Sequence, residues 1–348
     1  MNAPQELPAD LRVPAEWEPI QCVWLAWPHS VDTWPGRFNA IPAFYVDWVR
    51  KIAQSTPVRI LASGEVAASC QAAIEGIANI DIVDIPTNDA WIRDYGPTFV
   101  VNRHSGKVHA VNWRYNAWGG KYPPWDDDDA AALKIAGDQN LAVATSRMCV
   151  EGGAMEFDGR GRMLTTPGCL ITEARNPGWT KAQISQELHR RLGVTEIVWL
   201  DGGGLDGDDT DGHIDQLARF IDPENVVVAV ADDENDPNHA GLEDNFRQLH
   251  LWSDATKPRV NVHRLPIPPA REVSGQRVPE SYCNFLRLGK DRLLVPTFGA
   301  GTDDHAIGIL GELSGIRPEP IDCRELVWGL GALHCASREQ PAASKSIP

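Results

Sequence analysis

Long apolar runs and an excess of basic charge are both missing from this sequence. Among its 348 residues no stretch approaches the ~20 consecutive apolar residues that a membrane-spanning helix needs. Acidic residues outnumber Lys and Arg by 48 to 32, which gives a formal net charge of −16. Because nucleic acids and anionic membranes bind basic surfaces, the sequence predicts neither as a partner. A small cationic ligand fits the charge better.

The chain also lacks the cysteine and glycine patterns that define metal, disulfide and nucleotide sites. Its seven cysteines are scattered without a C-x-x-C pair, which predicts neither a zinc site nor a disulfide framework. No G-x-G-x-x-G or Walker A pattern follows a predicted strand. We therefore expect no metal and no organic cofactor. The first residues, MNAPQELPADLRVPAEWE, lack the apolar core of a secretory signal, so we expect a cytoplasmic location.

Regular elements follow one another in a repeating order. Short β-rich runs such as TFVVNR, VHAVNW and NVVVAVA lie between segments of helical periodicity. The predicted helices are 40–54, 65–77, 127–137, 180–193, 240–253 and 303–314. The order strand, strand, helix, strand recurs from Trp91, Glu151, His213 and Tyr282, at intervals of about 60 residues. A fifth unit would begin near His334 and be completed by the N-terminal part of the chain.

Each unit opens on an unusual polar cluster. The clusters read WIRDYG, EGGAME, DGHIDQ, SYCNF and LHC. If five units surround a common axis, their opening residues converge at one central site. Cys335 would then meet Asp94, Glu151, His213 and Asp215, although they lie far apart in the sequence.

Two of the clusters contain histidines that could donate or accept a proton. On a strand, His213 and Asp215 would point to the same face, which suits a general acid and base beside a carboxylate. The alternative is a histidine that only forms a structural hydrogen bond at a strand end. His334 directly precedes Cys335, and on a strand its ring would point away from the thiol, so we expect a structural role.

Tryptophans accompany the cluster that contains Asp94. Trp91 precedes it in WIRDYGP, and Trp118 follows in NWRYNAWGG. Aromatic faces beside a carboxylate suit a planar cation, which can stack while its N–H groups donate hydrogen bonds. The alternative is that these tryptophans only fill the core.

Taken together and in order, the segments NDAWIRDYGPTF, WRYNAWGGKY, EGGAMEFDG, DTDGHID, SYCNF and HCASREQP resemble the agmatine deiminase family, which is related to bacterial peptidyl-arginine deiminases. The resemblance spans roughly residues 13–341. It implies an α/β pentein, in which five ββαβ units form a five-bladed propeller with pseudo-fivefold symmetry. Residues 1–341 would form a single catalytic domain, 342–348 a disordered tail, and the chain a homodimer.

The resemblance also implies a reaction and its residues. The family hydrolyses a guanidine group, here agmatine to N-carbamoylputrescine and ammonia, through a covalent thiouronium on cysteine and without a cofactor. Cys335 would be the nucleophile, His213 the acid and base, and Glu151 its partner in proton handling, while Asp94 and Asp215 would grip the guanidinium. The implied substrate-binding residues are Trp91, Trp118, Asp209, Asn284 and Gly331.

Two departures from the family pattern leave other substrates open. Leu330 and Ala332 stand where the family has Gly and Asn in G-G-G-N-x-H-C, and the segment PPAREVSGQRVPE before SYCNF is short. Arg271 or Arg277 in that segment could meet a carboxylate, which would favour arginine at a peptide terminus as substrate. A different class is an inactive binder of cations, against which the retained Cys, His, Glu and Asp residues argue.

Overall fold

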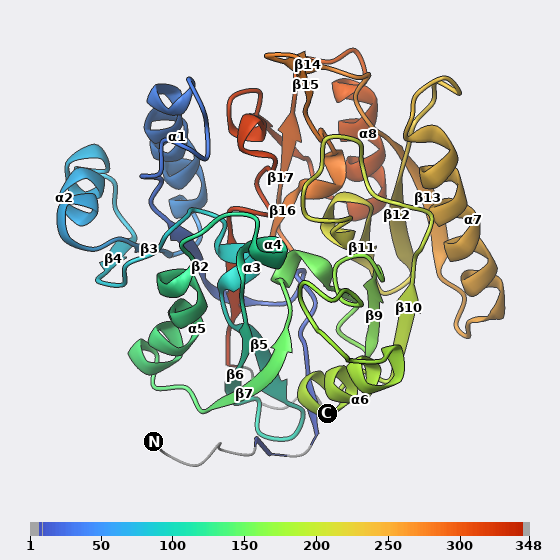
Figure 1. Ribbon diagram of the computed structural model, residues 1–348, viewed down its shortest axis with the longest axis horizontal. Coiled ribbons are helices and arrows are strands. Elements are labelled where there is room, and N and C mark those ends of the chain that lie inside the picture. Colours follow the sequence, from blue (N-terminus) through green and yellow to red (C-terminus); the bar gives the residue numbers. More distant parts are fainter. Residues whose placement is uncertain (1–6, 9, 344–348) are drawn as a thin grey trace.

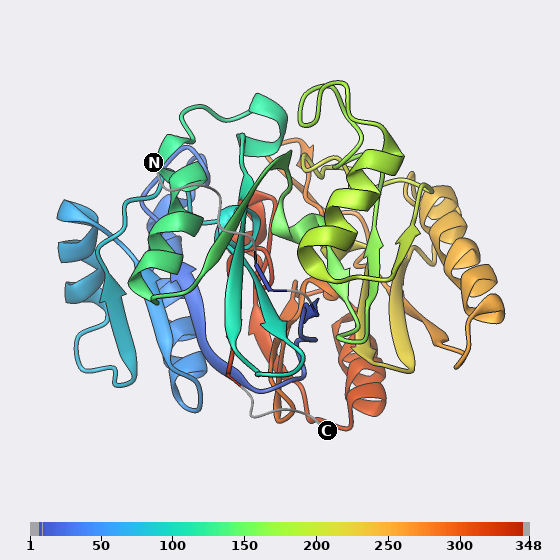
Figure 2. The same cartoon turned by 90° about the horizontal axis from the view of Figure 1, so that it is seen from below.

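Five small sheets of similar construction carry most of the chain in this computed structural model, which describes residues 7, 8 and 10–343. Each sheet contains an antiparallel strand pair followed by a parallel pair, and one helix connects the parallel strands. The ββαβ repeat predicted from the sequence is therefore confirmed. Helices α2 and α7 lie at opposite ends of the molecule in both ribbon views (Figures 1 and 2), and the short helices α3 and α4 lie near its middle (Figure 1).

The first four units follow one another along the chain. Their elements are β5 (Thr98–Asn102), β6 (Val108–Arg114), α5 (Asp126–Asp138) and β7 (Val143–Cys149); β8 (Glu156–Phe157), β9 (Arg162–Thr165), α6 (Lys181–Leu192) and β10 (Glu196–Trp199); β11 (Ala218–Asp222), β12 (Asn225–Val230), α7 (His239–Ala255) and β13 (Asn261–Pro266); and β16 (Leu286–Leu288), β17 (Arg292–Thr297), α8 (Asp303–Ser314) and β18 (Glu319–Asp322). A hairpin of β14 (Glu272–Val273) and β15 (Gln276–Arg277) precedes the last of them.

The fifth unit joins the two ends of the chain, as predicted. Its elements are β19 (Arg338–Pro341), β2 (Ile20–Ala26), η1 (Phe38–Ala40), α1 (Ile41–Ala53), β3 (Val58–Leu61), α2 (Gly64–Ala73) and β4 (Ile80–Val83). Strand β19 pairs antiparallel with β2, and the indole of Trp24 donates to Gln340 Oε1 at 2.8 Å. The backbone N–H of Ala342 bonds to Pro19, whereas residues 344–348 of the predicted tail lie outside the described residues. Strand β1 (Leu11–Arg12) pairs with β5.

All six predicted helices are present, and local sequence explains their ends. Helix α6 begins with a capping box between Thr180 and Gln183 and ends at Gly193, whose φ of 65° is left-handed. Its buried residues Ile184 and Leu188 share one face, because they are four residues apart. Helix α5 carries four aspartates in its first turn, where they complement the helix dipole.

The clusters that open the units are helical turns, so the strand geometry assumed for His213, Asp215 and His334 is wrong. They form α3 (Ile92–Tyr95), η2 (Gly152–Ala154), η3 (Ile214–Gln216) and η4 (Tyr282–Asn284), and residues 333–336 form a turn. Their buried backbone groups bond locally, as in Gly96 N–H to Ile92 O at 2.8 Å and Leu217 N–H to Ile214 O at 2.9 Å. Hydrogen bonds within each turn satisfy these buried backbone groups, because they precede the strands and have no neighbouring strand to pair with. The remaining short helices are α4 (Ala117–Gly120) and η5 (Leu326–Gly329).

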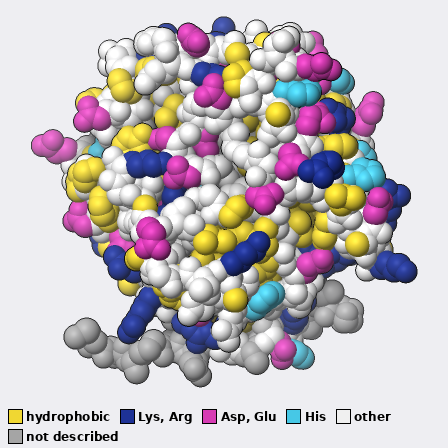
Figure 3. All heavy atoms as spheres, turned by 45° about the vertical axis from the view of Figure 1, so that its right-hand side comes forward, with side chains coloured by type: hydrophobic (Ala, Val, Ile, Leu, Met, Phe, Trp, Pro, Cys, Tyr) yellow, Lys and Arg dark blue, Asp and Glu magenta, His cyan; other side chains and the backbone are white. Residues whose placement is uncertain are grey.

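The core is rich in aromatic side chains near α1 and β2. Trp24, Trp27, Trp34, Trp48 and Tyr45 are all buried. The seven cysteines, all within the described residues, are buried and free. Among residues 7, 8 and 10–343, none of the helices has both the length and the apolar character needed to cross a membrane. On the face drawn in Figure 3, acidic and basic side chains are interspersed.

Candidate active site

The opening turns of the units bring the five predicted catalytic residues together. His213 lies between two carboxylates, with Nδ1 3.6 Å from Asp94 Oδ1 and Nε2 3.5 Å from Glu151 Oε2. The Cys335 thiol lies 3.6 Å from Asp215 Oδ2. All five side chains are buried. The convergence of clusters from different units is therefore confirmed.

One amide side chain holds the loop that carries Cys335. Asn284 Oδ1 accepts the backbone N–H groups of Ala332, His334 and Cys335 at 3.1–3.2 Å. Its Nδ2 atom donates to the Cys335 sulfur at 3.0 Å. The expectation that Asn284 binds substrate stays a prediction, because its contacts are with the loop and the thiol.

His213 is surrounded by negative charge. Burial on its own lowers the pKa of this imidazole, but the charges of Asp94 and Glu151 outweigh burial and raise the pKa to about 9. The ring is therefore an imidazolium at neutral pH, ready to donate a proton. Both ring nitrogens are buried, and their contacts of 3.5–3.6 Å with Glu151 and Asp94 are longer than well-formed hydrogen bonds.

Glu151 is fixed by an arginine that the sequence analysis missed. The Arg175 Nε atom donates to both oxygens of Glu151 at 2.8 and 2.9 Å, and its Nη2 atom donates to the Thr210 carbonyl. Burial alone would raise the pKa of Glu151, but His213 and Arg175 hold it below its usual value. Arg175 lies in the loop segment ITEARNPG, which contains no motif that could have revealed it.

Asp94 is held by neutral donors. Its Oδ2 atom accepts the indole N–H of Trp118 and its Oδ1 atom the backbone N–H of Gly153, both at 2.9 Å. Burial, opposed by His213 and reinforced by Asp215, raises the pKa of Asp94 to about 6. The carboxylate thus lacks a tightly bound arginine or lysine of the kind that Glu151 has.

Asp215 is paired on one oxygen only. Its Oδ2 atom lies 2.7 Å from Nδ1 of His334, whereas Oδ1 is buried without a hydrogen-bond partner. Burial alone would raise the pKa of Asp215, but His334 and His213 lower it. An unpaired carboxylate oxygen beside the thiol is suited to accept N–H groups of a cation. His334 faces Asp215 rather than the sulfur, as expected, and its structural role stays a prediction.

Glycine at position 153 allows the close approach of these groups. A Cβ atom there would lie 2.6 Å from His213 Nδ1, 2.9 Å from Asp94 Oδ1 and 3.0 Å from Asp215 Oδ2. Such distances are shorter than van der Waals contact, so any side chain would push the three groups apart. The EGG motif therefore serves close packing inside the site.

A cavity of about 600 Å³ ends at Cys335 and Asp94. Four of the predicted substrate-binding residues line it, namely Trp91, Trp118, Asp209 and Gly331. Further carboxylates on its wall are Asp32, Asp89 and Asp128. Lys121 also lines the cavity, but its ammonium is paired with Asp211 at 2.9 Å. The cavity is therefore acidic and suits a cationic ligand.

Leu330 and Ala332, the substituted positions of the family pattern G-G-G-N-x-H-C, lie on either side of Gly331, which lines this cavity. Leu330 lines it with a left-handed φ of 69°, a conformation that favours glycine and costs an L-residue about 1–2 kcal/mol. At Gly331, a Cβ atom would lie 2.6 Å from the Trp91 ring and 2.9 Å from Cys335 Cβ. Ala332 keeps its backbone bond to Asn284. The substitutions leave the cysteine loop closed.

Comparison with known proteins adds independent evidence. The sequence pattern of Porphyromonas-type peptidyl-arginine deiminases matches residues 12–341. The chain is 35% identical to an agmatine deiminase of Pseudomonas aeruginosa, over 99% of this chain and 100% of the relative.

Solved structures agree with the sequence relatives. An agmatine deiminase of Enterococcus faecalis superposes with a TM-score of 0.89 at 31% identity, covering 96% of this chain and 97% of that one. An agmatine deiminase of C. jejuni with substrate bound gives a TM-score of 0.87 at 28% identity, covering 97% of each chain. The match therefore extends over nearly the whole fold.

The charge around His213 leads to a titration that can be measured. The pKa of about 9 lies above the ordinary value of 6.5, so the imidazolium should persist as pH rises and be lost only near pH 9. Asp94→Asn removes the largest stabilising charge and should move the midpoint down. ¹⁵N NMR of histidine-labelled protein measures both titrations.

Asp32→Asn is the control, because Asp32 is exposed at the same cavity and should leave the midpoint unchanged. A wild-type midpoint near 6.5, or one that Asp94→Asn does not shift, would contradict this description of the site.

Proposed function

The chain belongs to the Porphyromonas-type peptidyl-arginine deiminase family, and on that premise we propose that it converts agmatine and water to N-carbamoylputrescine and ammonia. One observation carries the proposal. The buried Cys335 thiol lines an acidic cavity together with Asp94, and its sulfur lies 3.6 Å from Asp215 Oδ2. Relatives over the full length of the chain are agmatine deiminases, which supports the same reaction.

The guanidinium group enters the end of the cavity, where carboxylates hold the two edges of its plane. Asp94 and Asp215 accept its N–H groups from opposite sides, which fixes the plane of the cation. Trp91 and Trp118 flank the same end and offer aromatic faces to it. Because both carboxylates are buried, water does not compete effectively for these hydrogen bonds.

Binding of the cation prepares the nucleophile. Burial, reinforced by Asp215 and Asp94, raises the pKa of the Cys335 thiol well above its ordinary value. A guanidinium between these carboxylates offsets their charge and favours the thiolate, whose proton passes to solvent through the cavity. The sulfur then attacks the central guanidine carbon, and the C–S bond forms. His213, as imidazolium, gives a proton to the departing nitrogen, the C–N bond breaks, and ammonia leaves.

Hydrolysis of the thiouronium completes the cycle. His213 is now neutral and takes a proton from a water molecule, whose oxygen attacks the same carbon. The C–S bond breaks, the second proton of the water returns the sulfur to a thiol, and the carbon keeps the new oxygen as a ureido group. Glu151, itself fixed by Arg175, stabilises the imidazolium that forms in this step.

The acidic wall of the cavity favours a second cation over a carboxylate. Asp209 and Asp89 both line it, and burial, with Asp209 adding to the shift, raises the pKa of Asp89 to about 6. The two arginines that could have met a carboxylate are engaged elsewhere, Arg271 with Glu280 and Arg277 with Asp236. An ammonium tail such as that of agmatine therefore fits better than the carboxylate of arginine.

Other expectations from the sequence remain part of this proposal. We infer that residues 1–341 act as one catalytic domain and that the five units surround a common axis as a closed pentein propeller. The similar construction of the five sheets and the convergence of their opening turns support this arrangement. The homodimer, the cytoplasmic location and the absence of nucleic-acid and membrane partners stay predictions.

Substrate choice is the direct test of this function. Ammonia release should be fastest with agmatine and slower by at least about 10²-fold with free arginine and with peptides ending in arginine, because their carboxylates would approach Asp89 and Asp209. The comparison uses kcat/KM at one pH. Equal or better turnover of arginine substrates would reject the agmatine assignment. No ammonia from any guanidine would favour an inactive binder.

The contribution of Asp209 to binding of the ammonium tail can be measured separately from the chemical steps. Asp209→Asn should raise KM for agmatine about 10-fold or more, the range for one hydrogen bond to a charged group. The same variant should leave n-butylguanidine unchanged, since that compound lacks the distal ammonium. A similar loss with both compounds would place Asp209 outside the tail site.

Gly153 offers a second test with a matched control. Gly153→Ala should lower kcat/KM by about 10²-fold or more, because small displacements of catalytic groups are this costly. Gly137→Ala, in α5, has open space around the added methyl group and should leave activity unchanged. Normal turnover by a folded Gly153→Ala protein would show that the close contacts around His213 are not needed.

A further inference from the structure

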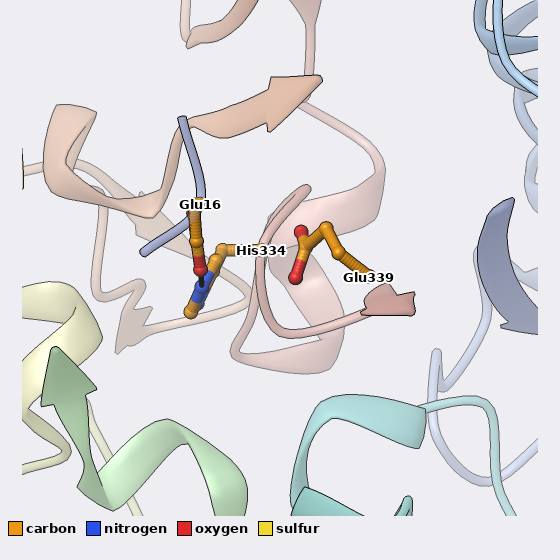
Figure 4. A group of neighbouring side chains, drawn as sticks. All are labelled: Glu16, His334 and Glu339. Carbon is orange, nitrogen blue, oxygen red and sulfur yellow. Dashed lines mark hydrogen bonds and ion pairs between the residues drawn. The ribbon is translucent and has the colours of Figure 1, made fainter. Parts of the chain in front are cut away.

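The imidazole beside Cys335 connects the site to the N-terminal segment. His334 Nδ1 lies 2.7 Å from Asp215 Oδ2, and Nε2 lies 2.6 Å from Glu16 Oε1. Glu16 comes from the turn between β1 and β2, 318 residues away in sequence, and reaches the ring as Figure 4 shows. The ring is almost completely buried, so these carboxylates rather than water are its hydrogen-bonding partners.

The two contacts define the protonation state of His334. A carboxylate only accepts hydrogen bonds, and a neutral imidazole donates from one nitrogen alone. Glu16 and Asp215 both approach at hydrogen-bonding distance, so the arrangement is satisfied when both ring nitrogens carry a proton. Glu16 itself stays ionised. Burial alone would raise its pKa, but Arg219 and His334 hold it well below its usual value.

The surrounding cations favour a proton over a metal ion at this cluster. Glu16, His334 and Glu339 have ligand atoms within 4.8 Å of one another, the spacing of a metal site. However, Arg93 donates to both oxygens of Glu339 at 2.8 Å, and Arg219 is paired with Glu16. A divalent ion would have to displace these guanidinium groups from a buried site, which is costly.

We propose that Glu16 is a positioning residue for the reaction: it keeps His334 as an imidazolium, which in turn fixes Asp215 and offsets its charge beside the Cys335 thiol. This inference rests on the proposed deiminase function. Asp215 lies 3.6 Å from the sulfur, so its uncompensated charge would oppose formation of the thiolate. The imidazolium also leaves Oδ1 of Asp215 free for the guanidinium.

The charged groups around His334 come from several elements. Asp215 lies on η3, Glu16 on the turn after β1, and Glu339 on β19. Arg93 from α3 donates to the backbone carbonyl of His334 at 3.0 Å, and Arg219 from β11 pairs with Glu16. Among these groups, only Glu16 and Asp215 bond the ring itself.

Glu16→Gln removes the negative charge of this side chain while it keeps the shape of the site. The amide keeps the length of the side chain and can donate to Nε2, so a neutral His334 can still donate from Nδ1 to Asp215. Glu18→Gln is the matched control. Glu18 lies on the same turn and bonds Arg12 and the backbone of Ala15, with no contact to His334. Thermal unfolding checks that both variants fold.

Activity and thiol reactivity are measured on both variants and the wild type. Glu16→Gln should lower kcat/KM for agmatine about 10- to 100-fold, the effect of one hydrogen bond to a charged group. The pH profile of Cys335 alkylation by iodoacetamide, followed by peptide mass spectrometry, should move to higher pH. Glu18→Gln should stay within about threefold of the wild type in activity, with an unchanged profile. A folded Glu16→Gln protein with the wild-type profile would overturn the proposal.

Two further measurements do not depend on the substrate, and the first of them does not need the Glu16→Gln protein. ¹⁵N NMR of the wild type at neutral pH should show both nitrogens of His334 protonated, with the signals assigned by their loss in His334→Asn. A bare ring nitrogen would overturn the proposal. In the His334→Asn background, Glu16→Gln should have little added effect on Cys335 alkylation, whereas full additivity would show that Glu16 acts by another route. If agmatine were not turned over while these results held, the proposed substrate would fail and the positioning role would stand.

Discussion

Burial of three carboxylates around one imidazole and one thiol is the constraint on which this structure depends. Glu151 and Asp215 have fixed side-chain partners, Arg175 and His334, whereas Asp94 is held by neutral N–H donors and faces His213. The site therefore keeps negative charge at the end of a cavity that a small cation can enter. Binding and activation are the same event in this account, because the cation that fills the cavity also removes the penalty on the thiolate.

The fold meets this constraint by placing helical turns where the units begin. A turn satisfies its own backbone groups, which leaves its side chains free to face the site without water. Glycines then allow an approach that no other residue permits, as at Gly153 beside His213. The last turn belongs to a unit whose strands come from both ends of the chain, so Cys335 is fixed only when β19 has paired with β2.

Periodicity and motif order predicted much of this arrangement, and what they missed depends on long-range contacts. The helices were predictable because apolar spacing and caps are local, as in α6. The conformation around His213 was not, because alternation on a strand was assumed where η3 makes a turn. Arg175 and Glu16 carry no motif, and their partners lie 24 and 318 residues away, so only the folded chain reveals them.

The central claim is that Cys335 forms a covalent bond to a guanidine carbon held by the surrounding carboxylates. The most direct measurement is acid quenching of the wild-type enzyme within the first turnovers of agmatine, followed by mass spectrometry of its cysteine peptides. The account predicts an amidine-type adduct on the peptide that contains Cys335, and its disappearance once agmatine is exhausted. Turnover without any cysteine adduct, or an adduct on another buried cysteine such as Cys283, would contradict it.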